Sequence, residues 1–308
     1  MKLDDFYFVN ENTGWLIRGI DSLKKIYKTT DGADTWNSIF ENDFNVFRSI
    51  GFIDSLNGFV GTLDSNILMY TTNGGFNWQK KEEFIGDKPK GICGLFILDS
   101  LNIYGCGRYF TPAHFIKSSN GGTTWTSKKI DQVSLLVDCY FFNHQKGIIV
   151  GGKSSENYYE AKTVILFTSD GGDSWNENYI GQTPGEICWK IYFLDSMIGF
   201  VSVQSFLKDS SKLSYLKTIN GGLTWKEYSF TIQPGYEALS IIFIDEKTGL
   251  IGGMRNLEDG NVSGESYITT NNGINWKQNL NYLNVNRFKY SNGNLFASGK
   301  YFYKIPLK

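Results

Sequence analysis

The chain has 308 residues, of which 41% are hydrophobic and 16% aromatic, so it can build a sizeable core. Its 30 basic and 31 acidic residues give a formal net charge of −1, which provides no global attraction to nucleic acid or to an anionic membrane. No stretch approaches the roughly 20 apolar residues of a membrane-spanning helix.

The first residues lead directly into a strand-like run, without the charged and apolar regions of a secretory signal peptide. We therefore expect either a cytoplasmic protein or a mature chain from which an export signal was removed.

Short apolar runs separated by turn residues recur from one end of the chain to the other. Aromatic and β-branched runs between Asp, Asn, Ser and Gly turns are typical of all-β structure, and no helical period of useful length interrupts them. The clearest unit, at residues 52–61, passes from an aromatic–apolar–Asp run through a short turn to a Gly-rich strand. Seven copies of this strand–turn–strand pattern begin near Phe6, Ser49, Gly94, Cys139, Lys190, Ser240 and Arg287.

A second motif follows in six of the units, as an eight-residue segment that opens with Ser or Thr and ends in Trp. Its third residue and closing tryptophan are, copy by copy, Asp31 and Trp36, Asn73 and Trp78, Asn120 and Trp125, Asp170 and Trp175, Asn220 and Trp225, and Asn271 and Trp276. Successive tryptophans are 42 to 51 residues apart, which indicates a repeat architecture.

The residue types of this motif predict a tight turn. Asp or Asn can accept bonds from backbone N–H groups two or three residues further on, and the Ser or Thr hydroxyl can add a bond across the turn. The glycines that usually come next tolerate positive φ, and Trp is expected to pack between neighbouring units. Ala33 replaces one glycine and predicts a less strained site, whereas Asn272, which replaces another, tolerates the left-handed region.

The motif resembles the Asp-box, or BNR repeat, of sialidases, sortilin-type receptors and some glycoside hydrolases. Together with the preceding strand–turn–strand pattern, it is most similar to the propellers of the photosystem II stability and assembly factors and their non-photosynthetic bacterial relatives. The resemblance covers the whole chain and implies a β-propeller with an assembly or chaperone-like role. It also favours an exported, mature chain.

We predict one domain over residues 1–308, an all-β propeller of seven blades with four antiparallel strands each, named A to D from the axis outward. Six blades is the alternative. The last unit has no Asp-box and little room for a strand D. Either the first residues supply that strand, or the chain extends upstream, or the last blade has three strands.

In such blades the Asp-boxes are C–D turns and share a face with the A–B turns, so their Asp and Asn residues are expected to be structural. The B–C and D–A connections form the other face, the mouth face, where recognition is expected. Four consecutive units have long B–C connections, and neutral variation in length is the alternative explanation. They span residues 108–113, 153–162, 204–213 and 255–265.

Arginines and aromatics are predicted to gather at the mouth face. Guanidinium groups suit carboxylates and phosphates, so the mouth is expected to receive an acidic group; pairing with Asp138, Glu186 and Glu237 is the alternative. The arginines are Arg18, Arg48, Arg108, Arg255 and Arg287. The aromatics are Tyr109, Phe110, Tyr158, Tyr159, Trp189 and Tyr236, as partner contacts or as packing.

The sequence meets few requirements of an enzyme. It lacks the Arg-Ile-Pro signature of sialidases, although five arginines are enough for an arginine triad. Only two histidines, His114 and His144, are present, and no metal-ligating cluster or phosphate-binding loop is evident. A glycosidase would need two carboxylates converging in the central pocket at roughly 5–9.5 Å.

Four cysteines are expected to be buried free thiols, because their spacing fits neither a zinc site nor a Cys-x-x-Cys motif. They are Cys93, Cys106, Cys139 and Cys188, and the first two, on paired strands, are the one disulfide candidate.

We thus predict a monomeric, non-catalytic scaffold without metal or cofactor that binds a protein or peptide, with an acidic group, on the mouth face. The expected contacts are Arg18, Arg48, Arg108, Tyr109, Trp189, Tyr236, Arg255 and Arg287. The alternative is carbohydrate binding, or glycoside-hydrolase or sialidase-like activity, at the same mouth. No nucleic acid partner is expected, and the location is extracellular or periplasmic after export and cytoplasmic otherwise.

Overall fold

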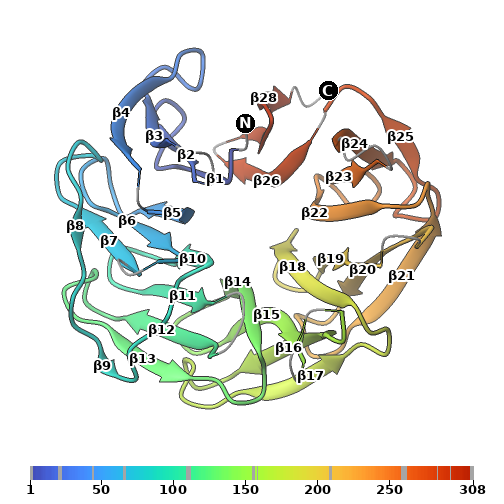
Figure 1. Cartoon of the computed structure of the whole chain (residues 1–308), viewed down its shortest axis with the longest axis horizontal. Helices are drawn as coiled ribbons and strands as arrows, with labels where there is room; N and C mark the ends of the chain where they lie inside the picture. Colours follow the sequence, from blue (N-terminus) through green and yellow to red (C-terminus); the bar gives the residue numbers. More distant parts are fainter. Residues whose placement is uncertain are drawn as a thin grey trace.

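A computed structural model describes residues 3–19, 23–43, 45–64, 67–108, 112–154, 157, 159–207, 210–257, 262–282, 284–291 and 293–305. The regular secondary structure of these residues is β-strand only, and none of them belongs to a helix that could cross a membrane. The strands form seven sheets around a central axis, as Figure 1 shows. The seven-bladed β-propeller predicted from the sequence is confirmed.

Within the described residues, blades 1 to 6 each contain four antiparallel strands, A to D, and blade 7 contains three. Blade 1 comprises β1 (Asp5–Phe8), β2 (Gly14–Arg18), β3 (Lys24–Thr29) and β4 (Asn37–Asn42), and blade 2 comprises β5 (Phe47–Phe52), β6 (Gly58–Thr62), β7 (Leu68–Thr71) and β8 (Gln79–Lys80). Blade 3 comprises β10 (Gly94–Ile97), β11 (Ile103–Gly107), β12 (His114–Ser118), β13 (Thr126–Lys129) and an added outer strand, β9 (Ile85–Gly86), parallel to β13. Blade 4 comprises β14 (Leu135–Phe141), β15 (Gly147–Lys153), β16 (Lys162–Thr168) and β17 (Asn176–Ile180), and blade 5 comprises β18 (Glu186–Phe193), β19 (Gly199–Ser205), β20 (Lys212–Thr218) and β21 (Lys226–Thr231). Blade 6 comprises β22 (Tyr236–Phe243), β23 (Gly249–Asn256), β24 (Val262–Thr269) and β25 (Lys277–Asn279), and blade 7 comprises β26 (Val285–Ser291), β27 (Asn294–Gly299) and β28 (Phe302–Ile305).

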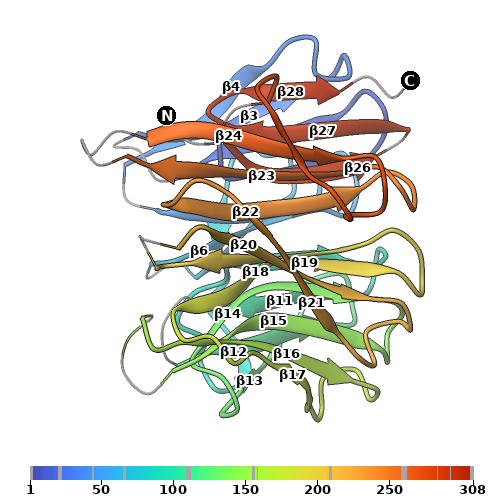
Figure 2. The same ribbon diagram turned by 90° about the vertical axis from the view of Figure 1, so that its right-hand side faces the viewer.

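The hydrophobic core lies between the blades rather than inside any one of them. Strands A and B are built largely of apolar and small residues, because neighbouring blades cover both of their faces. One such cluster joins Ile148 and Val150 of blade 4 to Cys188 and Val203 of blade 5. In the edge-on view of Figure 2 the strands run across the thickness of the ring, so each interface extends from one face to the other. All four cysteines are buried free thiols, as predicted.

The Asp-box turns share one hydrogen-bonding pattern in all six copies. In the fourth copy the Thr168 hydroxyl donates to Asp170 Oδ1 (2.7 Å) and accepts from the Gly172 N–H (2.9 Å). Asp170 Oδ1 also accepts from the N–H of Ser174 at 2.9 Å, four residues further along rather than the two or three predicted. The equivalent bond is made by Asp31, Asn73, Asn120, Asn220 and Asn271.

Ala33 adopts the left-handed conformation that glycine adopts in the other copies. Its φ is 75°, and its N–H donates to Thr29 Oγ1 at 3.0 Å, so the turn has the same shape as the other five copies. The prediction of a less strained site is therefore wrong. Asn272 lies at φ 61°, in the region that asparagine was expected to tolerate.

The Asp-box tryptophans pack between blades, as predicted. Trp125 of blade 3 meets Phe59 of blade 2 edge to face, with the ring centroids 5.4 Å apart. Trp36 of blade 1 meets Phe302 of blade 7 at 4.9 Å and so helps to close the ring. The clusters that join a blade to the preceding one also contain Trp78, Trp175, Trp225 and Trp276.

Blade 7 has three strands in the described residues, which is one of the three arrangements that the sequence left open. The backbone N–H of Leu3 donates to the Gly299 oxygen (2.7 Å), and Asn286 Nδ2 donates to the Leu3 oxygen (3.1 Å). The residues before β1 therefore contact the inner strands of blade 7 and do not add to its outer edge, which is β28.

Candidate functional site at the mouth face

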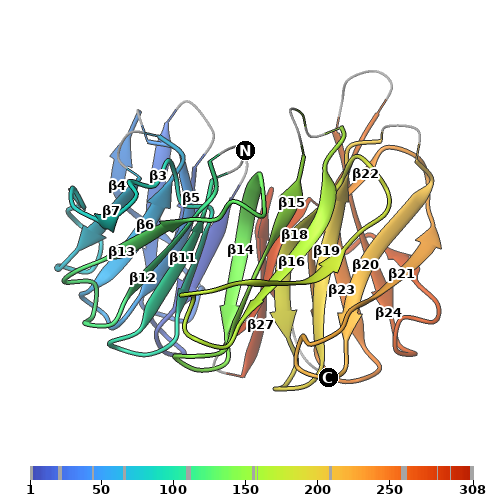
Figure 3. The same ribbon diagram turned by 90° about the horizontal axis from the view of Figure 1, so that it is seen from below.

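Each face of the ring carries the turns and connections that the sequence predicted for it. The backbone N–H of Gly171, in an Asp-box, donates to the oxygen of Gln145 in the A–B turn of the same blade (2.7 Å). The Asp-boxes and the A–B turns therefore share one face, and the B–C and D–A connections form the mouth face; Figure 3 shows the ring edge-on between them.

Blades 4 to 6 have longer strands B and C than blades 2 and 3. Strands β15, β16, β19 and β20 have 7 residues each and β23 and β24 have 8, whereas β6, β11 and β12 have 5 and β7 has 4. The predicted loop at residues 255–265 is largely a hairpin, because Arg255 pairs with Ser263 across β23 and β24. Of the four connections predicted to form the wall, the one in blade 6 is thus largely strand, whereas those in blades 4 and 5 join strands that end at Lys153 and Ser205 to strands that begin at Lys162 and Lys212.

Arg48, at the start of β5, reaches across the axis at the mouth end of the channel. Its Nη1 lies 3.0 Å from Asp4 Oδ1. Its guanidinium group also lies 5.2 Å from the ring of Trp189 in blade 5, within the range of a cation–π contact. Blades 2 and 5 lie on opposite sides of the ring (Figure 1), so this contact spans the channel.

A second layer of ion pairs, which we call the charged plug, lies next to it. Arg287 of blade 7 places Nη1 2.5 Å from Asp138 Oδ2 of blade 4 and Nε 3.6 Å from Asp5 Oδ1 of blade 1. Lys289 Nζ lies 2.7 Å from Asp5 Oδ1, and Lys190 Nζ lies 4.0 Å from Asp138 Oδ1. The pairing of Arg287 with Asp138, weighed from the sequence as the alternative to partner binding, is present.

The plug does not have the properties of a glycosidase acid pair. Asp5 and Asp138 both approach one guanidinium, and both are buried. Burial opposes ionisation of Asp5, but Lys289, Arg287 and Lys190 together outweigh it and lower the pKa of this carboxyl. A general acid needs a raised pKa and access to the substrate, so Asp5 serves as a partner of the buried cations.

Blades 4 to 6 carry partly exposed apolar residues near their mouth-face ends, here called the mouth patch. Tyr159 is 50% exposed and Leu207 is 40% exposed. The patch also includes Phe206, Met254 and Arg255, whose side chain is 27% exposed and has its Nε 2.7 Å from Glu265 Oε1. Beneath it lies a buried cluster of Leu135, Val137, Ala161, Ile187, Trp189 and Leu239.

The structure brings together some of the predicted contact residues and separates others. Trp189 and Tyr236 are buried, and the Tyr236 hydroxyl donates to the Glu265 backbone oxygen (3.1 Å), so both support the wall from within. Arg18 and Arg108 are half-buried on blades 1 and 3. The predictions for Tyr109, Phe110 and Tyr158 lie outside the described residues.

Sequence reasoning missed Phe206, Leu207 and Met254. A detectable signal was present for the first two, since two adjacent large apolar residues stand inside a connection that is otherwise polar.

Fold and site together define a seven-bladed β-propeller with a plugged channel and an apolar, arginine-bearing mouth. No protein-family profile matches the chain, and no curated protein matches its sequence. The solved structure "YCF48 bound to D1 peptide" aligns with a TM-score of 0.66 at 15% identity, over 97% of this chain and 90% of that chain. YCF48 from Cyanidioschyzon merolae aligns with a TM-score of 0.64 at 17% identity, over 97% and 92%.

An ancestral GH74 enzyme also aligns with a TM-score of 0.64, at 12% identity, over 98% of this chain but only 44% of that chain. At these identities the comparisons show that the chain shares the propeller fold of these proteins.

Proposed function

We propose that the protein is a non-catalytic recognition scaffold that binds a protein or peptide on its mouth face. The observation that carries this proposal is the mouth patch, which exposes Tyr159 of blade 4 and Leu207 of blade 5 on the same face as the partly exposed Arg255 of blade 6. An apolar patch with an arginine at its edge is the usual composition of a protein-binding hot spot.

The closed channel supports the same function. Arg48 and Trp189 span the mouth end, and the charged plug lies beneath them. A ligand over the channel therefore meets a surface rather than a deep central pocket, and such a surface suits a macromolecular partner better than a small substrate.

The shared fold adds a precedent. A propeller of this fold has been solved with a peptide bound, YCF48 with the D1 peptide. By extension we propose an assembly or chaperone-like role for this chain, with a partner whose acidic group contacts Arg255.

Identification of the partner by cross-linking from the mouth face, followed by quantitative binding, tests the proposal. We expect Leu207→Asp and Tyr159→Ala each to weaken binding by about tenfold or more. Leu223→Asp is the matched control, because Leu223 is 57% exposed in an Asp-box on the opposite face. Normal binding by both mouth variants, or equal loss in the control, contradicts the proposal.

A glycan array with the same variants addresses the carbohydrate alternative. Binding of a glycan that Tyr159→Ala abolishes would favour a lectin over a protein-binding scaffold.

A further inference from the structure

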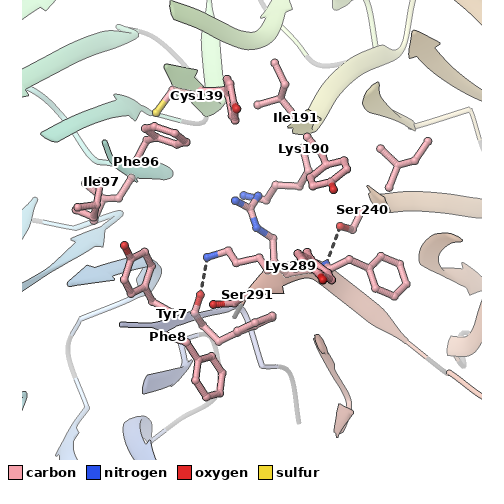
Figure 4. Close-up of a pocket in the computed structure, with 18 residues that line it drawn as sticks. Tyr7, Phe8, Phe96, Ile97, Cys139, Lys190, Ile191, Ser240, Lys289 and Ser291 are labelled. Atoms are coloured by element: carbon pink, nitrogen blue, oxygen red, sulfur yellow. Dashed lines mark hydrogen bonds between the residues drawn. The ribbon is translucent and has the colours of Figure 1, made fainter. Parts of the chain in front are cut away.

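A pocket of about 290 Å³ lies on the other side of the charged plug, in the half of the channel nearer the Asp-boxes. It is lined by the ends of strands A that lead into the A–B turns, from β1, β10, β14, β18, β22 and β26. Figure 4 shows these strands surrounding one central space. The pocket is thus separate from the mouth patch, and a ligand bound in it is independent of the proposed function.

The wall of the pocket is aromatic. Tyr7, Phe96, Tyr140 and Tyr192 line it and are half-buried. The hydroxyls of its tyrosines at positions 7, 140 and 192 form no hydrogen bond with another described residue. Burial raises the pKa of Tyr192 to about 12, so this hydroxyl stays protonated and can donate to a ligand at neutral pH.

The inner end of the pocket is cationic. Lys190, Lys289 and Arg287 line it and face the two carboxylates of Asp5 and Asp138, which leaves an excess of one positive charge. In Figure 4 the side chain of Lys190 extends toward the centre of the pocket, and that of Lys289 is joined by a dashed line to the backbone oxygen of Phe6.

One buried donor at this end also lacks an acceptor. Arg287 Nε lies 3.6 Å from Asp5 Oδ1, beyond hydrogen-bond range, and has no hydrogen-bond acceptor among the described residues. A buried guanidinium N–H without an acceptor is costly, and its positive charge favours an anion at this end of the pocket.

We propose that this pocket binds a small aromatic monocarboxylate, with its ring against the tyrosines and its carboxylate at Lys289 and Arg287. The single excess positive charge matches one carboxylate, and the aromatic wall provides stacked or edge-to-face contacts for one ring. The volume is near the lower end of ligand pockets, roughly 300–1,000 Å³, which favours a one-ring ligand.

Calorimetry with phenylacetate, and with its uncharged and cationic analogues phenylacetamide and phenethylamine, tests the charge requirement. We expect phenylacetate to bind about tenfold more tightly than the amide, and the amine not to bind. Equal binding of the acid and the amide, or no binding of the acid, overturns the proposal.

Variants locate the site. Lys289→Met is expected to weaken phenylacetate binding about tenfold, and Ser291→Trp, which fills the pocket without removing a charge, to abolish it. Tyr192→Phe removes only a hydroxyl and should weaken binding severalfold at an unchanged Tm, whereas Tyr228→Phe, on the outer strand β21, should have no effect. Normal binding by Ser291→Trp and Tyr192→Phe would place the ligand elsewhere and overturn the proposal, even if Lys289→Met does not fold.

Discussion

At the scale of single residues, the hydroxyl of Thr168 shows what holds an Asp-box together. It is fully buried, donates to Asp170 Oδ1 and accepts from the N–H groups of Asp170 (3.3 Å) and Gly172 (2.9 Å). Thr168→Val keeps the shape but leaves these groups without their partner, so we expect a loss of about 1–3 kcal/mol in the free energy of unfolding. Urea unfolding measures it, and Thr231→Val, at an exposed position on β21, should change it by less than about 0.5 kcal/mol. Equal effects of the two variants would contradict this account.

Ala33 provides a second test at this scale. An L-residue at φ 75° bears a cost of about 1–2 kcal/mol that glycine avoids, although glycine also gains entropy in the unfolded chain. Ala33→Gly is therefore expected to stabilise the protein by about 0.5–1 kcal/mol.

The converse change gives the control. Gly172 lies at φ 91°, and a Cβ there would meet Phe115 Cε1 at 2.2 Å, so Gly172→Ala should destabilise by about 2 kcal/mol or more. Destabilisation by Ala33→Gly would show that the methyl group contributes more by packing than the conformation costs.

The Asp-box also shows the limit of prediction at this scale. Its residue types predicted a closed turn with Asp or Asn as acceptor, and that is what all six copies form. Neither the bond to the N–H four residues on nor the positive φ of Ala33 could be predicted, because both result from the path of the backbone and not from the identity of the side chain.

At the scale of elements, the segment 255–265 was expected to be a loop but is largely a hairpin, and Glu265 shows why. Residues 255–265 are rich in Asn, Glu, Asp, Gly and Ser, a composition typical of loops. In the structure Glu265 is buried, pairs with Arg255 at 2.7 Å and accepts from the Tyr267 hydroxyl at 3.1 Å. A polar network between long-range partners thus replaces apolar packing, and composition alone does not distinguish it from a loop.

Glu265→Gln tests this network. The amide keeps the shape but loses the charge opposite Arg255, so we expect a loss of about 1–3 kcal/mol in unfolding free energy and weaker binding at the mouth patch. Thermal unfolding measures the first effect, with Glu246→Gln in an exposed A–B turn as the control. No difference between these variants would mean that backbone pairing alone holds β23 and β24 together.

At the scale of the whole molecule, the charged plug joins strands A of blades 1, 4, 5 and 7. Its charged residues lie within apolar strands; Lys190, for example, lies between Trp189 and Ile191. In a propeller, a charge on such a strand can pair with charges from other blades in the central channel. That signal was available for Lys190 and Lys289, and sequence reasoning missed it. Which charges meet across the axis depends on the closed ring, so the contact of Arg48 with Trp189 could not be predicted from the sequence.

Arg287→Ala is expected to be strongly destabilising, because it leaves Asp138 and Asp5 buried with fewer cations. Removal of one partner from a buried pair costs about 3–5 kcal/mol, and the Arg287 and Asp138 side chains are only 12% and 1% exposed. Lys117→Ala breaks the exposed pair with Asp173 (30% and 73%) and should cost less than about 1 kcal/mol. Chemical denaturation compares them, and a loss near 1 kcal/mol for Arg287→Ala would mean that water replaces the guanidinium.

The pH dependence of stability reports on the same layer. Burial lowers the pKa of Lys289 from 10.5 to about 8, against the opposing effect of Asp5. Between these values the unfolded chain binds more protons than the folded one, so the contribution of Lys289 to stability rises with pH from about 8 toward 10. Lys190 contributes in the same direction, because burial lowers its pKa too. Two further charges act on Lys289: Arg287 lowers its pKa and Asp138 raises it.

Denaturation at about pH 7.5, 8.2 and 9.0 should therefore show a rise in the stability of the wild type that Lys289→Met reduces. The range stops near pH 9 because burial raises the pKa of the Cys106 and Cys188 thiols, which opposes the rise above the ordinary cysteine value of 9.0. Burial also raises the pKa of Tyr7, Tyr140 and Tyr192, which opposes it further above the ordinary tyrosine value of 10.0. Phenylacetate affinity should change in the opposite direction and fall as pH rises through about 8, because the neutral amine no longer attracts a carboxylate. The two opposite slopes separate the titration of Lys289 from general alkaline unfolding, which would weaken stability and binding together.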